Sequence, residues 1–136
     1  MVIRMKKIHL LNDLENRIFE VIAEDLPPLE KSQLTYDLQH LTTVRRASAG
    51  EVINFEIEGY DRPPYKGQNP YSMEGSMLDE DGAELCIIPF KDQNGRLLEL
   101  EIIRWEDGDM INPQIDTIRA CLAPSYSGDG NSGDMA

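Results

Sequence analysis

The chain has 136 residues, of which 40% are hydrophobic, so it can form one domain with a real core and is not wholly disordered. It holds no run near the roughly 18 apolar residues of a membrane span, and no cleavage site of a signal peptide follows its N-terminus. These features predict a cytoplasmic protein that makes no membrane contact. We expect one domain over residues 1–123 and a disordered tail over 124–136, rich in Gly, Ser and Asp.

The net charge of −12 is unevenly placed along the chain. Residues 1–50 hold seven basic and seven acidic side chains, whereas residues 51–136 hold six basic and eighteen acidic ones. Such a field repels nucleic acid and anionic lipid and attracts basic partners. The alternative interpretation is that the acidic surface only keeps the protein soluble.

Two helices are expected before residue 42. Asn12 and Glu15 have the spacing of a capping box, and apolar residues then recur at helical spacing until Pro27-Pro28, which predicts a helix over 13–25. Pro28 suits the first turn of a second helix over 29–41. The β-branched run from Thr42 to Val44 favours an extended segment.

Strands are expected after residue 50. Residues 51–58 alternate cleanly, with Phe55 and Ile57 facing the core, and 72–78 form a weaker strand. Between them lies a long loop, Gly59 to Tyr71, of a length that is often functional. The apolar spacing from Ile111 to Leu122 predicts a short terminal helix.

Residues 84–105 form the central hairpin of the predicted sheet, because two apolar runs flank Asn94-Gly95. An apolar inner face results if Phe90 pairs with Leu98, which also pairs Ile88 with Leu100 and Cys86 with Ile102. The predicted fold is therefore α+β, with two N-terminal helices on one face of an antiparallel sheet of about four strands and a short C-terminal helix. We expect the following side chains to be buried together: Phe55, Ile57, Ile88, Leu98, Leu100 and Ile102.

Catalytic and metal motifs are weak. If Asp79 opens a calcium loop, Phe90 stands where the last carboxylate is required, so an ordinary turn is favoured. Glu99 and Glu101 share one strand face, as in any polar-out strand, and no cleft supports sugar chemistry. The two histidines lie far apart in the sequence, and Cys86 and Cys121 are interpreted as reduced core residues. We therefore expect no catalytic residue, no metal and no cofactor.

The outer face of the sheet gathers carboxylates on neighbouring strands, which is unfavourable unless a cationic partner meets them. Aromatic residues among them would serve as anchors. The alternative is a solvated sheet face. The predicted partner-binding residues are Glu56, Glu58, Glu74, Glu99, Glu101, Trp105, Tyr60, Tyr65, Asp79 and Asp81.

The phrase GRLLELEIIRWEDG, from Gly95 to Gly108, resembles the last hairpin of a group of small uncharacterised bacterial domains. More loosely, the chain is similar to immunity proteins of contact-dependent growth inhibition and other polymorphic toxin systems. The similarity is one of overall character and assigns no functional residue. It implies a non-enzymatic protein that masks a cognate toxin domain, such as a basic nuclease, by protein–protein occlusion. The alternatives are an adaptor or phage-borne module that binds another protein, and an enzyme of unrecognised type.

Overall fold

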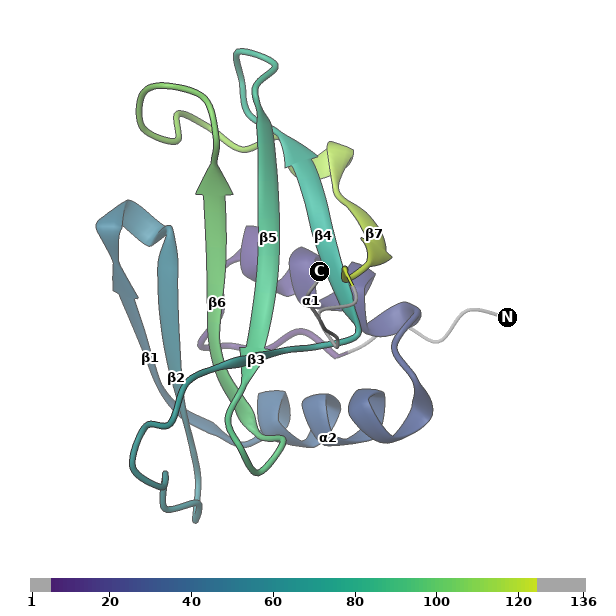
Figure 1. Cartoon of the computed structure of the whole chain (residues 1–136), viewed down its shortest axis with the longest axis vertical. Coiled ribbons are helices and arrows are strands. Elements are labelled where there is room, and N and C mark those ends of the chain that lie inside the picture. Colours follow the sequence, from purple (N-terminus) through teal and green to yellow (C-terminus); the bar gives the residue numbers. More distant parts are fainter. Residues whose placement is uncertain (1–5, 125–136) are drawn as a thin grey trace, which may run out of the picture.

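The computed structural model describes residues 6–124, and the predicted disordered tail lies almost wholly outside these residues. The described part forms two α-helices and one sheet of seven strands (Figure 1). The elements are α1 (Asp13–Glu24), α2 (Pro28–Gln39), β1 (Leu41–Ala47), η1 (Ser48–Gly50), β2 (Val52–Ile57), β3 (Asn69–Pro70), β4 (Met73–Leu78), β5 (Glu84–Lys91), β6 (Leu97–Arg104), η2 (Ile115–Thr117) and β7 (Arg119–Leu122).

Helix α1 begins and ends close to its predicted limits because its signals are local. The Asn12 side chain accepts a hydrogen bond from the Glu15 amide at 2.8 Å, and the Glu15 carboxylate accepts one from the Asn12 amide at 3.0 Å. This confirms the predicted capping box. The buried stripe of α1, which includes Ile18, Phe19 and Ile22, faces the sheet.

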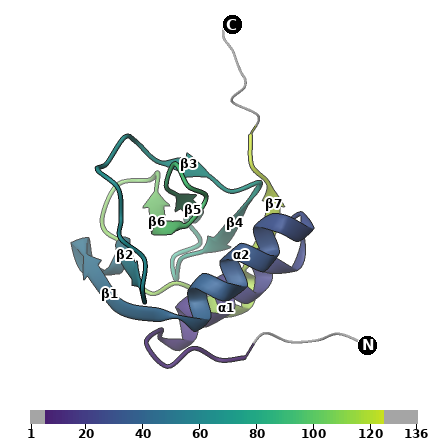
Figure 2. The same cartoon turned by 90° about the horizontal axis from the view of Figure 1, so that it is seen from below.

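Helix α2 starts at Pro28. Proline suits this position because an N–H group in the first turn of a helix has no partner within the helix. Its buried side is narrow and consists of Leu34, Asp37 and Leu38. Both helices pack on one side of the sheet, and the segment that carries β3 crosses the other side (Figure 2). We call the side opposite the helices the helix-free face.

The prediction of about four strands and a C-terminal helix is wrong. The path through the sheet is β1-β2-β6-β5-β4-β7, and β3 pairs with β5. The region expected to be a terminal helix forms the short turn η2 and then β7, whose residues pair from Met73↔Leu122 to Ser76↔Arg119 with β4. The edge of β4 offers hydrogen-bond partners to the backbone of this segment. These long-range hydrogen bonds stabilise a strand more than the weak apolar periodicity of the segment stabilises a helix.

The predicted hairpin register is also wrong over most of its length. Next to the turn, Lys91 pairs with Leu97, as the predicted register requires. Leu98 is then an extra residue, so that Phe90 pairs with Glu99 and Pro89 with Leu100. This β-bulge shifts the register by one residue and sends the odd-numbered residues of β5 into the core.

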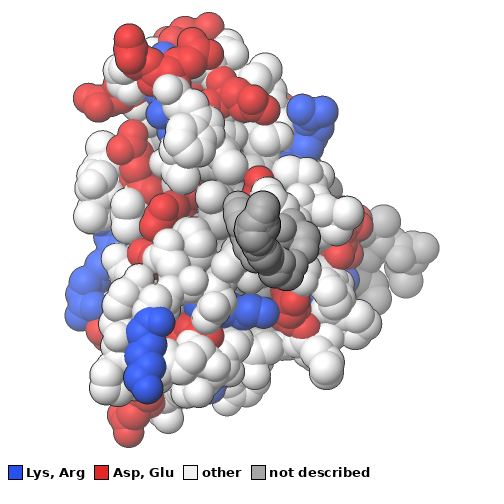
Figure 3. All heavy atoms as spheres, viewed as in Figure 1, with Lys and Arg blue, Asp and Glu red and all other residues white. Residues whose placement is uncertain are grey.

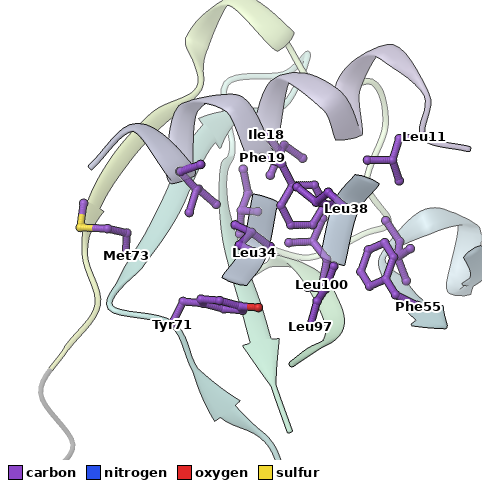
Figure 4. Packing of buried hydrophobic residues seen from close by; sticks show 14 of the residues in the cluster. Leu11, Ile18, Phe19, Leu34, Leu38, Phe55, Tyr71, Met73, Leu97 and Leu100 are labelled. Atoms are coloured by element: carbon purple, nitrogen blue, oxygen red, sulfur yellow. The ribbon is translucent and has the colours of Figure 1, made fainter. Parts of the chain in front are cut away.

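The core lies between the helices and the inner face of the sheet (Figure 4). Of the six side chains expected there, Phe55, Ile57, Leu100 and Ile102 are buried. Ile88 and Leu98 are only half-buried, since the bulge turns them away, and Leu85, Ile87 and Leu97 fill the core in their place. The Phe19 and Phe55 rings meet edge to face at 5.7 Å, which joins α1 to β2.

The long loop has a structural role that sequence reasoning did not find. Strands β2 and β6 pair only from Val52↔Glu101 to Asn54↔Glu99 and then separate. Arg62 enters the gap between them, and its guanidinium donates to the Phe55 carbonyl at 2.7 Å and to the Leu97 carbonyl at 2.9 Å. Asp92 accepts from the same guanidinium at 2.9 Å. The loop therefore supplies the donors that the separated strands lack.

Candidate protein-binding surface

Arg104 organises one end of the sheet. It closes β6 at an inward-facing position opposite Leu85, where its side chain is 7% exposed. Its guanidinium lies 2.7 Å from the Asp79 carboxylate and 2.7 Å from that of Asp81, and it also donates to the Asp107 carbonyl. One cation thus joins the end of β6, the β4–β5 turn and the chain that follows β6. These contacts strongly raise the pKa of Arg104, chiefly through the hydrogen bonds with Asp81 and Asp79.

The Asp79 carboxylate fixes the loop after β6. It is fully buried and accepts hydrogen bonds from the amides of Ile111 at 2.8 Å and Asn112 at 2.7 Å. Burial alone would raise the pKa of Asp79, but these amides and Arg104 lower it overall. For Asp81, the hydrogen bond with Arg104 lowers the pKa to about 2. Both carboxylates are therefore charged at neutral pH.

The loop after β6 and the end of β4 display apolar groups among carboxylates. Trp105 is 73% exposed, Ile111 is 55% exposed, and Leu78 is 44% exposed. We call residues 78–84 and 105–112 the acidic end, and acidic side chains gather there at the top of the molecule (Figure 3). Its exposed acidic residues are Glu80, Asp81, Glu84, Glu106, Asp107 and Asp109.

The helix-free face continues from the acidic end. By strand pairing, Glu99 and Glu101 on β6 and Glu74 on β4 point to this side, with Ile88 and Ile103 among them. Burial raises the pKa of Glu99, and the charge of Glu101 adds to the rise. The charge of Glu101 thus disfavours the ionised form of Glu99, and a cation placed between the two carboxylates would relieve this repulsion.

The remaining predicted partner-binding residues divide into two groups. Glu56, which pairs with Arg45 at 2.7 Å, Glu58 and the 70% exposed Tyr65 lie on the surface near the other end of the sheet. Tyr60 donates to Asp92 within the cluster that holds Arg62. Asp79 is buried, so its prediction as a contact residue is corrected, because its carboxylate is fully occupied inside the protein.

Sequence reasoning missed the importance of Arg104, Leu78 and Ile111. The role of Arg104 could have been predicted, because Arg104 ends an apolar strand of the expected hairpin and the turn before that hairpin carries two aspartates. The cysteines were wrongly placed in the core. Cys121 is exposed, and Cys86 is half-buried with its sulfur 3.7 Å from the Glu74 carboxylate on the helix-free face.

Within residues 6–124, no group of three or more His, Cys, Asp and Glu side chains is placed to hold a metal ion. None of the helices in this part of the chain is long and apolar enough to cross a membrane. Comparison with models of protein families, with curated proteins and with solved structures finds no match to this chain.

Proposed function

We propose that this protein is an immunity protein that binds and neutralises a cognate toxin domain with a basic surface. The observation that carries the proposal is the acidic end, where an exposed tryptophan stands among carboxylates on a loop fixed by Asp79 and Arg104. A loop ordered before binding loses little conformational entropy on association, which favours tight binding. The charges attract and orient a cationic partner, and the tryptophan supplies the apolar anchor.

The helix-free face extends this surface. Glu99 and Glu101 repel each other in the free protein, so cationic side chains of a partner would gain more there than at isolated carboxylates. The toxin would then be inhibited by occlusion, since the acidic surface covers a basic site that otherwise meets its substrate. The second candidate, an adaptor that binds a different basic protein, rests on the same surface.

The experiment measures binding kinetics with the protein that the neighbouring gene encodes. Glu106 and Asp107, which are both exposed, are changed together to lysine. The matched control changes Glu24 and Asp25, exposed at the end of α1, to lysine, so that both variants alter net charge equally. We expect the first pair to lower the association rate about tenfold at low salt and the control pair to have little effect.

Trp105→Ala should act mainly on the dissociation rate, because an anchor contributes after the encounter. Trp105 is the single tryptophan of the chain, so its fluorescence reports directly on contact at the acidic end. Equal effects of the two lysine pairs, with unchanged Trp105 fluorescence, would show that the partner binds elsewhere. If the neighbouring gene encodes no toxin and a different basic protein binds this surface, the adaptor function replaces the immunity function.

A further inference from the structure

A groove of about 510 Å³ lies where the segment before α1 passes the end of α2 and the start of β1. Asp37 near the end of α2 contacts the Leu97 end of β6, whereas Arg104 and the acidic end lie at the opposite end of that strand. The groove is therefore remote from the proposed partner surface. Its polar walls are formed by Lys6, Lys7, His9, Gln39 and His40.

The charge of this groove is opposite to that of the molecule. No Asp or Glu lines it, although the chain carries a net charge of −12. It brings together the only two histidines, which are 31 positions apart in the sequence, and two lysines. Lys7 pairs with the exposed Asp13 at 2.7 Å, while Lys6 makes no ion pair with any residue of the described range. Lys6 thus contributes a charge that is not already balanced.

His40 is oriented at the groove by two contacts with Tyr36. Its Nδ1 lies 2.7 Å from the Tyr36 carbonyl oxygen, and a carbonyl only accepts, so Nδ1 carries a proton. The imidazole also stacks on the Tyr36 ring, with centroids 4.0 Å apart. Nε2 makes no hydrogen bond within residues 6–124, which leaves it available to a ligand.

The end of α2 could oppose an anion, because helix C-termini carry negative partial charge. Two of its terminal carbonyls are already occupied: the Tyr36 carbonyl by His40 Nδ1, and the Asp37 carbonyl by the His40 amide at 3.1 Å. These bonds reduce the negative field at the groove. The aliphatic walls, which include Leu38 and Leu41, suit an apolar portion of a ligand.

We propose that this groove binds a small phosphate ester. The phosphate is held by Lys6, His9 and His40, and the organic portion packs on the aliphatic wall. Lysine provides a compact point charge for phosphate, and the apolar contact distinguishes an ester from the free ion.

The test is an NMR titration of the whole chain with phenyl phosphate, with inorganic phosphate and phenol as separate probes. We expect saturable shifts of the amides of residues 8–11 and 39–41 with phenyl phosphate, and binding at least fivefold weaker with either other probe. Lys6→Gln should weaken binding by about fivefold. Lys6 is exposed, so this change should leave the fold intact. The control Lys31→Gln removes another exposed lysine, on α2, and should leave binding unchanged.

His40→Gln should also weaken binding, and the retained amide spectrum will show whether the fold is intact. The proposal is overturned if shifts do not saturate, if Lys31→Gln has the same effect as Lys6→Gln, or if inorganic phosphate binds as tightly as the ester.

Discussion

Asp37→Ala tests the buried polar contacts that join α2 to the central hairpin. The Asp37 side chain is fully buried and accepts hydrogen bonds from Arg96 Nε at 2.9 Å, from the Leu97 amide at 2.9 Å and from Gln33 Nε2 at 3.1 Å. Removing one partner of a buried ion pair costs about 3–5 kcal/mol, because the other charge is left uncompensated. The Leu97 amide, which is also buried, would lose its acceptor at a cost of about 1–3 kcal/mol.

These two costs are not additive, because relaxation of the structure and entry of water reduce both. We therefore expect Asp37→Ala to lower the free energy of unfolding by about 4 kcal/mol in total. That is a large part of the roughly 5–15 kcal/mol that stabilises a domain of this kind. Urea unfolding followed by circular dichroism measures the loss. Trp105 lies at the opposite end of the sheet, so coincident fluorescence and dichroism transitions would show that unfolding remains two-state.

Asp25→Ala is the matched control, because Asp25 is exposed at the end of α1 and makes no side-chain hydrogen bond within residues 6–124. Asp25→Ala should change the free energy of unfolding by no more than about 0.5 kcal/mol. A loss below about 1 kcal/mol for Asp37→Ala would refute the reasoning, since it would mean that the carboxylate contributes little beyond its own desolvation.

Three further predictions concern single side chains. Leu100→Ala, at a fully buried position, should reduce the free energy of unfolding by about 2–5 kcal/mol, and a loss under about 0.5 kcal/mol in urea would contradict its place in the core. Tyr71→Phe should be neutral or stabilise by up to about 1 kcal/mol, because the buried Tyr71 hydroxyl has no hydrogen-bond partner within residues 6–124. A clear loss in thermal unfolding would instead reveal a bound water. Glu99→Gln should stabilise the protein at pH 7 by on the order of 0.5 kcal/mol. Folding raises the pKa of Glu99, so the folded state of the wild type is favoured while Glu99 is protonated, below about pH 4, and loses stability as Glu99 ionises at higher pH. The stability difference between Glu99→Gln and the wild type should therefore vanish in unfolding measured below about pH 4.

The parts of the fold that were predictable from the sequence depend on neighbours in the sequence. Asn12 and Glu15 are three residues apart, so their reciprocal bonds could be predicted without the rest of the chain. The alternation of residues 51–58 likewise predicted β2, and the weaker strand expected over 72–78 is observed as β4.

The errors in the fold concern distant partners. The bulge at Leu98 lets Leu97, Leu100 and Ile102 all face the helices, which no pairing rule for an isolated hairpin includes. Strand β7 forms because the edge of β4 is free, and that edge is not visible in residues 111–122 alone.

The candidate site was predictable only in part. The outward direction of Glu99 and Glu101 follows from strand alternation, and the structure places both, half-buried, on the helix-free face, with the exposed Trp105 just beyond the end of β6. The burial of Asp79 could not be predicted, because its amide donors come from Ile111 and Asn112, about thirty residues later.

Arg62 and Asp37 also constrain the order in which the chain can fold during synthesis. Arg62 bonds to Asp92 and to the Leu97 carbonyl, and its only other side-chain hydrogen bond in the described part of the chain is to the Phe55 carbonyl of β2. Asp37 bonds to Arg96 and to the Leu97 amide, and its only other side-chain hydrogen bond within residues 6–124 is to Gln33 of its own helix. A nascent chain that ends before residue 92 holds both helices and β1–β2 but must keep these two charges in water. We therefore expect the N-terminal half to stay loosely packed on the ribosome until the β5–β6 turn emerges, and the domain then to close in a single late step.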